Sequence, residues 1–564
     1  MKRLRWQVLI VVLALVVIAA LLLWQQPEVV QQVVTIQPAT GGVYTEALIG
    51  SFGRLNPLLN FYNPVDRDVN RLIFNGLVSF DDRGLPQGDL AESWGISQDG
   101  TIYNFSIRED ATWHDGAPVT SEDLVFTVDL IRNEEFPTPQ DIREFWEEIE
   151  VKSLDEKTLQ FQLPEPFAPF LDYLTFGVLP KHLLDTIPPN ELVDAEFNKE
   201  PVGSGPYRFD HLLSEEGQIL GVVLTAFDDY YGGRSYIDQV VFRYYPDAGS
   251  GLAAYQEGKV MGISQVNGGI LDDVLKEPEL NLYTGRMPLL SLVYMNLDNP
   301  ELPFFQDPTM RRALLMGINR QWLVDRVLNS QAIIADGPIP PGTWAYYDGI
   351  ERVNYNPEAA IRTLKEAGYT IPAEGGGVRV KDDVPMAFEM VYPDDPINTA
   401  MAEAIQKDWE KLGVEANLKP VTYEVLLSEY LEPRTYQVAL VALNLTRTPD
   451  PDPYPFWDQA QITGGQNYAN WDDRQASEYL EQARISVDIG ERTKAYRNFQ
   501  VRFTQEMPAF PLVYSVYSYA VDGQVLGVSM GPLFDPSDRF ATLPSWFLLA
   551  NRPSVSEINP TETP

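Results

Sequence analysis

The chain has 564 residues and carries 80 acidic against 42 basic side chains, which gives a formal net charge of −38. This length exceeds one ordinary core and predicts about three domain-sized units. The absence of cysteine excludes disulfides, thiolate metal sites, iron–sulfur clusters and a thiol nucleophile, and the negative charge argues against nucleic-acid binding, which needs a cationic surface.

The N-terminal segment has the pattern of a membrane-targeting sequence. Three basic residues among the first five precede an uninterrupted apolar run from Val8 to Leu23. A helix from Trp6 to Trp24 would be roughly 28 Å long, close to the thickness of a bilayer core. The basic flank stays in the cytoplasm, so the rest of the chain is exported. The flanking tryptophans and the lack of a small-residue cleavage motif favour an uncleaved anchor over a removable signal peptide.

The two ends of the chain therefore differ from its body. We expect residues 1–26 to be a membrane anchor or signal segment and residues 27–40 to be a short stalk. Residues 551–564 are rich in Ser, Pro, Thr and Glu and are expected to form a flexible tail. The body between them is placed on the extracytoplasmic face of the plasma membrane, in the periplasm or at the cell surface, either anchored or released after cleavage.

Helix and strand signals alternate along the body and predict a mixed α/β class. Thr120 and Asp123 form a capping-box-like start to a helix over 123–132. The remaining expected helices lie at 307–326, at 356–367 and at 399–412, with Gly413 as a stop signal. Short alternating or apolar runs predict strands at 158–163, 240–244, 290–296 and 437–443.

The sequence holds little that indicates catalysis. His114, His182 and His211 are widely separated and are expected to be hydrogen-bonded structural residues rather than metal ligands. The triplet Gly203-Ser204-Gly205 lacks the spacing of a nucleophile elbow and is typical of a tight turn. No dinucleotide or phosphate-loop fingerprint is present. We therefore predict no catalytic residue, no metal site and no cofactor.

A series of short motifs makes the body recognisable. In chain order they include Asn75-Gly76-Leu77-Val78, Asp89-Leu90-Ala91-Glu92-Ser93-Trp94, Trp113-His114-Asp115-Gly116, Pro201-Val202-Gly203-Ser204-Gly205-Pro206-Tyr207, Arg311-Arg312-Ala313-Leu314 and Gln466-Asn467-Tyr468. By their number, order and spacing, residues 41–548 resemble the family 5 extracellular solute-binding proteins. These are the dipeptide-, oligopeptide- and nickel-binding components of ABC importers.

The resemblance implies an α/β, two-lobed clamshell like that of periplasmic binding proteins, of the class II or cluster C type with an extra domain II. Domain I would comprise 41–80, 204–290 and 510–550, domain II 81–203 and domain III 291–509. Strands crossing between domains I and III would form the hinge, and closure of the cleft is the signal that a permease reads. The protein would then be a monomeric receptor that works with an ABC permease and ATPase, and not an enzyme.

The resemblance also implies a ligand anchor in the proline-rich segment from Arg447 to Trp457. Four prolines between 449 and 455 favour a rigid, extended backbone. In peptide-binding relatives, an Asp of an Asp-Pro motif in this region contacts the α-ammonium of the ligand. Asp450 is the first candidate for this role and Asp452 the second. The alternative is an Asx-Pro turn whose carboxylates are solvated.

Other residues are candidates to line the cleft, and packing in the core is an equally good interpretation of each. They are Trp457, Tyr468, Trp471, Tyr294 and Asn296. No basic residue is assigned to a ligand carboxylate. Peptides are the leading ligand class, and an oligosaccharide, a metal chelate or another solute is the alternative on the same fold. An exported hydrolase, or a sensory or adhesion protein with this fold, is a further alternative.

Overall fold

The computed structural model describes Trp6 and residues 11–18, 38–373, 375–446 and 449–549. The chain divides into two compact units, residues 1–39 and residues 40–564. In the first unit residues 11–18 are helical, and the rest of the predicted span Val8–Leu23 lies outside the described residues. No helix among the described residues is both long enough and apolar enough to span a bilayer. The predicted tail and most of the predicted stalk also lie outside the described residues.

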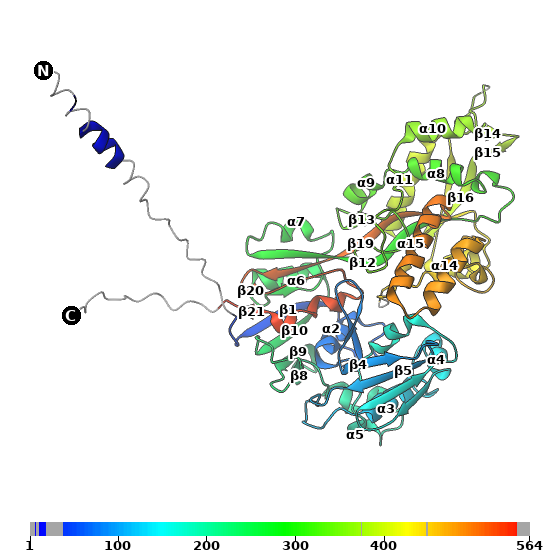
Figure 1. Cartoon of the computed structure of the whole chain (residues 1–564). Helices are drawn as coiled ribbons and strands as arrows, with labels where there is room; N and C mark the ends of the chain where they lie inside the picture. Colours follow the sequence, from blue (N-terminus) through cyan, green and yellow to red (C-terminus); the bar gives the residue numbers. More distant parts are fainter. Residues whose placement is uncertain (1–5, 7–10, 19–37, 374, 447–448, 550–564) are drawn as a thin grey trace. The chain divides into compact units, whose positions relative to one another are not determined.

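The second unit is built on a mixed 11-stranded sheet (Figure 1) with the strand order β17-β16-β18-β12-β19-β11-β1-β10-β9-β8, and β13 also pairs with β19. The strands are β1 (Val43–Ile49), β8 (Tyr207–Glu215), β9 (Gln218–Ala226), β10 (Gln239–Tyr245), β11 (Gly262–Ile263), β12 (Leu280–Met295), β13 (Ala332–Ile334), β16 (Ala387–Pro393), β17 (Glu415–Val421), β18 (Val438–Asn444) and β19 (Ala509–Asp522). The strands expected at 240–244 and 437–443 are confirmed, and the one expected at 290–296 is the end of the longer β12.

Strands β12 and β19 connect the two halves of this sheet. They pair antiparallel from Leu280 opposite Asp522 to Tyr294 opposite Ala509, with register shifts in between. The first part of this ribbon adjoins β11, and the second part adjoins β18. Two long strands therefore belong to both strand groups, which is the arrangement that the resemblance predicts for a hinge. The proposed domain boundaries stay a prediction.

The second half of β12 is buried on both faces. Val293 and Met295 belong to one hydrophobic cluster, and Leu290, Leu292 and Tyr294 belong to another. Since successive side chains of a strand point to opposite faces, the apolar run encodes a central strand covered on both sides. The helices around it are α8 (Pro308–Met316), α9 (Arg320–Trp322), α10 (Pro357–Glu366), α11 (Pro396–Leu412), α14 (Arg474–Ile485) and α15 (Ile489–Glu506).

One expected helix is interrupted. The pattern at 307–326 predicted a continuous helix, but α8 ends at Met316 and α9 begins at Arg320. The Asn319 side chain accepts a hydrogen bond from the Trp322 N–H at 3.0 Å, so it caps a new helix after Gly317. The expected helices at 356–367 and 399–412 are confirmed as α10 and α11, and Gly413 ends α11 in the left-handed conformation with φ 79°.

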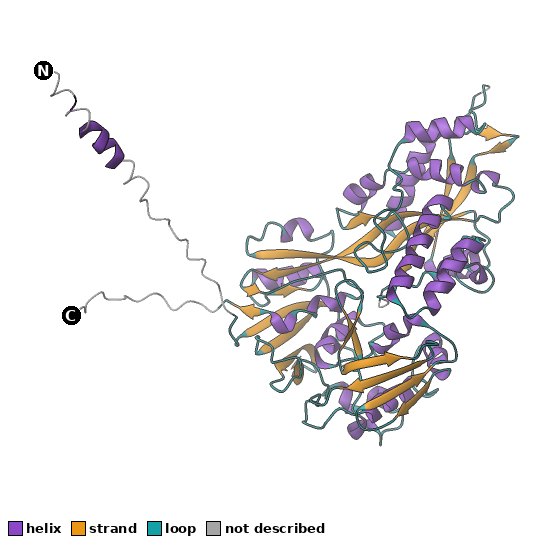
Figure 2. Cartoon of the chain, in the orientation of Figure 1, coloured by secondary structure: helices purple, strands orange, loops and turns teal. Residues whose placement is uncertain are grey.

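A second, four-stranded sheet with the order β4-β5-β7-β6 lies within residues 81–203. Its elements are β4 (Ala91–Ile96), β5 (Ile102–Ile107), β6 (Glu150–Ser153) and β7 (Thr158–Gln162), with α3 (Ser121–Ile131), α4 (Gln140–Glu147) and the 3₁₀ helix η1 (Ala168–Leu174). The predicted capping box is present, because the Thr120 N–H donates to Asp123 Oδ2 at 2.8 Å. Figure 2 shows the strands of both sheets in orange and the helices that pack on them in purple.

The body contains further helices and strand pairs. They are α2 (Pro64–Ile73), α5 (Lys181–Leu184), α6 (Ala248–Gln256), α7 (Leu271–Val274), α12 (Tyr423–Val425), α13 (Tyr454–Trp457) and the paired strands β2 (Val78–Phe80) with β3 (Pro86–Gly88), β14 (Val380–Lys381) with β15 (Val384–Pro385) and β20 (Val525–Leu526) with β21 (Phe547–Leu548).

The turn at Gly203-Ser204-Gly205 is held by His114. The Gly203 N–H donates to His114 Nδ1 at 3.2 Å, and His114 Nε2 donates to the Gly205 carbonyl at 3.0 Å. A Cβ on Gly203 would lie 1.9 Å from the Ile73 carbonyl oxygen at the end of α2, so only glycine fits there. Burial lowers the pKa of His114 to about 4, which keeps the ring neutral and able to accept the Gly203 N–H. The expected structural histidine and tight turn are thus parts of one joint.

Candidate ligand-binding site

Asp450, the first candidate anchor, is the acidic half of a buried ion pair. The residue is 4% exposed. Its Oδ2 is in close contact with Arg492 Nη2 from α15. Its Oδ1 accepts hydrogen bonds from the Tyr496 hydroxyl and from the Asp452 N–H, both at 3.1 Å. The Asx turn of the alternative interpretation is therefore present, but its first carboxylate is buried and paired rather than solvated.

Asp172 meets this segment from the part of the chain that follows β7 of the four-stranded sheet. It lies in η1, and its Oδ2 accepts a hydrogen bond of 2.8 Å from the Asp450 N–H. Burial raises the pKa of Asp172 well above its usual range, and the neighbouring Asp450 carboxylate raises it further. Burial and the nearby carboxylate thus disfavour the charged form of Asp172, and Asp450 keeps Arg492 as its own counter-ion.

Asp452, the second candidate, has fewer partners for its carboxylate oxygens than Asp450. Its side chain is 17% exposed, and its Oδ2 lies 3.4 Å from Arg484 Nε of α14. Its Oδ1 is buried and has no hydrogen-bond partner among the described residues. Burial raises the pKa of Asp452 to about 6, against the opposing effect of Arg484. A buried carboxylate oxygen without a donor is an unusual feature of a folded protein.

Aromatic rings hold Arg484 beside Asp452. The guanidinium carbon lies 4.3 Å from the ring centroid of Tyr454 and 5.0 Å from that of Phe167, which are distances typical of cation–π contacts. Phe167 immediately precedes η1, so the stack joins the same two parts of the chain that the hydrogen bond between Asp172 and Asp450 joins.

The predicted aromatic residues lie together, and they lie in the core. Tyr294, Trp457, Tyr468 and Trp471 all belong to one buried cluster. The ring centroids of Tyr294 and Trp457 are 5.7 Å apart, and those of Trp457 and Trp471 are 6.4 Å apart. These contacts match the packing interpretation. Contact of any of the four with a ligand stays a prediction.

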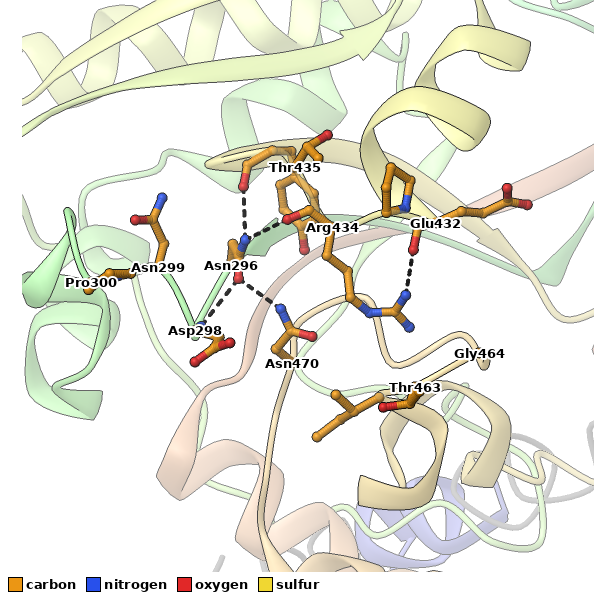
Figure 3. Close-up of a pocket in the computed structure, with 13 residues that line it drawn as sticks. Asn296, Asp298, Asn299, Pro300, Glu432, Arg434, Thr435, Thr463, Gly464 and Asn470 are labelled. Atoms are coloured by element: carbon orange, nitrogen blue, oxygen red, sulfur yellow. Dashed lines mark hydrogen bonds between the residues drawn. The ribbon is translucent and has the colours of Figure 1, made fainter.

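Asn296 lies at a different place. It borders a polar cavity of about 560 Å³ (Figure 3), whose lining also includes Asp298, Arg434 and Asn470. The Asn296 amide donates to the carbonyls of Arg434 and Tyr436 at 2.9 and 3.1 Å. Its oxygen accepts from the Asp298 N–H and the Asn470 amide at 3.2 and 2.9 Å. The amide is fully used in joining three loops, which indicates a structural role.

The cavity and the acidic segment are not one site. Asn296 follows the end of β12, where Met295 pairs with Val438 at the beginning of β18. The segment with Asp450 and Asp452 follows the other end of β18, which is Asn444. The structure thus brings the two aspartates together and separates Asn296 from them. In the described part of the chain, no group of three or more acidic or histidine side chains is arranged to hold a metal ion.

Sequence reasoning missed the partners of the two aspartates. Asp172, Arg484, Arg492 and Tyr496 come from elements that no local motif connects to the proline-rich segment. One signal was available in α15, where the buried stripe runs through Ala495, Tyr496 and Phe499 and includes Arg492. A charged residue in the apolar stripe of a helix needs a buried partner, although the sequence does not say which.

Comparisons with known proteins identify the chain. The sequence profile of the bacterial extracellular solute-binding proteins, family 5 Middle, matches residues 86–468. The chain belongs to this family. Its relatives include the dipeptide-binding protein of Escherichia coli strain K12, which is 28% identical over 471 residues that cover 79% of this chain and 84% of the relative. The oligopeptide-binding protein AppA of Bacillus subtilis strain 168 is 27% identical over 508 residues, which are 88% and 91% of the two chains.

A solved structure agrees with this assignment. AppA from Bacillus subtilis in complex with a nonapeptide superposes with a TM-score of 0.64 at 25% identity, over 91% of this chain and all of that one. The mixed α/β fold of periplasmic peptide-binding proteins is thereby confirmed. The resemblance inferred from the motifs is also confirmed, and with it the role: this member of family 5 is an extracytoplasmic substrate-binding receptor of an ABC importer and not an enzyme.

Proposed function

We propose that this family 5 receptor captures peptides and delivers them to its ABC permease and ATPase. The two relatives described above are named for peptides and match 79% and 88% of this chain. The observation that carries the proposal is the unpaired Oδ1 of Asp452. The α-ammonium of a peptide offers three N–H donors and a positive charge to such an oxygen, and a charge-assisted bond of this kind is strong.

Within the proposal, Asp452 replaces Asp450 as the first candidate for the ammonium contact. Asp450 already has Arg492, Tyr496 and the Asp452 N–H on its two oxygens. A ligand would have to displace a buried guanidinium to reach it, which leaves a buried charge unpaired. Asp452 shares only one oxygen with Arg484. The rest of a peptide would be held by main-chain hydrogen bonds, with its side chains in tolerant pockets.

Thermal unfolding with a ligand library tests the peptide assignment. Peptides of two to nine residues should raise the midpoint, since a ligand at one hundred times its Kd stabilises the folded state by about 2.7 kcal/mol. Oligosaccharides and metal chelates of the same concentration serve as controls and should leave the midpoint unchanged. If one of these solutes shifts the midpoint and no peptide does, the assignment to peptides is wrong.

We also propose that Val8–Leu23 anchors the receptor, as a monomer, in the membrane that holds its permease. The support is the uninterrupted apolar run between Trp6 and Trp24. Protein from membranes washed with alkaline carbonate should stay in the pellet, and its intact mass should include residues 1–26. Recovery in the soluble fraction of a chain cut after the apolar run would contradict the anchor.

A further inference from the structure

The centre of the proline-rich segment, residues 449–453, has few main-chain donors of its own. Residues 449–453 read Pro-Asp-Pro-Asp-Pro, and proline has no N–H. Only Asp450 and Asp452 can therefore donate main-chain hydrogen bonds. The Asp452 N–H is used within the segment, on Asp450 Oδ1 at 3.1 Å. The Asp450 N–H is the one that reaches outside the segment, to Asp172 Oδ2 at 2.8 Å.

This bond connects distant parts of the chain. Asp172 and Asp450 are 278 residues apart; Asp172 follows β7 of the four-stranded sheet, and Asp450 follows β18 of the 11-stranded sheet. Helices α14 and α15, drawn in orange in Figure 1, belong to the side of Asp450, and α14 lies against η1, which holds Asp172. The stack of Arg484 on Phe167 crosses the same boundary at 5.0 Å. A movement of the region that holds Asp172 or of the region that holds Asp450 changes the distance between the Asp450 N–H and Asp172 Oδ2. The position of the segment therefore depends on both regions.

We propose that Asp172 is a positioning residue for the receptor: from the region 81–203 it fixes the backbone that presents Asp450 and Asp452. It does not touch the ligand in this role, and its effect on binding rests on the function proposed above. A single accepted hydrogen bond is sufficient, because the prolines on both sides restrict φ and transmit the position of Asp450 to Asp452.

Asp172 contacts the segment by accepting a hydrogen bond from the Asp450 N–H, so we expect its oxygen to matter more than its charge. The residue is buried, and burial together with the nearby Asp450 carboxylate raises its pKa well above the usual range. A carboxyl group and a carboxamide have nearly the same shape, and both offer an acceptor oxygen to an N–H. Asparagine should therefore replace Asp172 without loss, whereas alanine removes the acceptor and leaves the Asp450 N–H buried without a partner.

The test compares Asp172→Ala, Asp172→Asn and Asp129→Ala in the full chain by hydrogen exchange and by titration with a peptide that stabilises the wild type. Asp129 is a half-exposed residue of α3 in an ion pair with Arg132, and serves as the matched control. With alanine at 172, the Asp450 amide should exchange about 100-fold faster and peptide affinity should fall about tenfold, as expected for a segment that must be ordered on binding. Asparagine should restore both quantities, and Asp129→Ala should change neither.

Three results would overturn the proposal. These are unchanged exchange of the Asp450 amide in Asp172→Ala, failure of asparagine to restore its protection, or an equal effect of Asp129→Ala. If Asp172→Ala does not fold, Asp172→Asn decides alone, because the proposal requires wild-type protection of the Asp450 amide in that variant. If the wild type binds no peptide, the proposed function fails, while the exchange measurement still decides the positioning role.

Discussion

Replacing Arg539 with methionine should lower the free energy of unfolding by about 3–5 kcal/mol, which is the cost of breaking a buried ion pair on one side. Arg539 is completely buried. Its Nη1 and Nη2 donate to the two carboxylate oxygens of Asp68 at 2.7 Å each, and Nη2 also donates to Glu46 Oε1 at 2.9 Å. Glu46 is in β1 and Asp68 in α2, so the variant leaves two buried carboxylates without a counter-ion.

Urea unfolding followed by tryptophan fluorescence measures this loss. Arg234→Met is the control, because Arg234 contacts Asp228 and Asp238 at the surface and such pairs contribute less than about 1 kcal/mol. The Arg539→Met variant should regain stability as the pH falls, since its folded state must then bind protons on Glu46 and Asp68, whose pKa values burial already raises. If both variants lose the same free energy of unfolding, the buried ion pairs of Arg539 stabilise the protein no more than the surface ion pairs of Arg234.

Asp452→Asn should weaken the binding of peptides with a free N-terminus by about 100-fold, within the range for removing one partner of a desolvated charge pair. Binding of N-acetylated peptides should change little. Because the pKa of Asp452 is about 6, affinity of the wild type should also fall as the pH drops through 6 and the carboxylate takes up a proton. The variant should lack this pH dependence. Isothermal titration with matched free and acetylated peptides measures all of these effects.

Asp450→Asn is the matched comparison, because Asp450 lies two residues from Asp452 and its carboxylate has different partners. Asparagine at 450 leaves Arg492 buried without a full counter-charge, so its main effect should be a loss of about 3 kcal/mol in the ligand-free protein. If Asp450→Asn discriminates between free and acetylated peptides and Asp452→Asn does not, the anchor is Asp450. Equal losses for both peptide classes in both variants would remove the ammonium contact altogether.

Local features of the fold could be predicted because their causes are local. The capping box of Thr120 and Asp123, the left-handed stop at Gly413 and the alternating strands are set by residues within a few positions of one another. The continuous helix expected at 307–326 failed at Asn319, where the side chain binds the backbone ahead of it. Periodicity alone does not distinguish such a cap from a helical residue.

The site was predictable only in part, because its contacts span the whole chain. The prolines singled out this segment, but its end at Tyr454–Trp457 is the helix α13 rather than the expected extended backbone. The relation of its aspartates to Arg484, Arg492 and Asp172 depends on how remote elements pack. The same holds for Asn296, whose four hydrogen bonds involve groups up to 174 residues away. The local sequence does not distinguish an asparagine that lines a cleft from an asparagine that joins loops.

The position of Arg539 in the chain also determines when folding can finish. Glu46 and Asp68 are made early, whereas the residue that neutralises them is made only near the C-terminus, 493 and 471 positions later. During synthesis, the N-terminal part therefore cannot reach its final packing. We therefore expect the packing around Glu46 and Asp68 to be completed only after Arg539 has been synthesised.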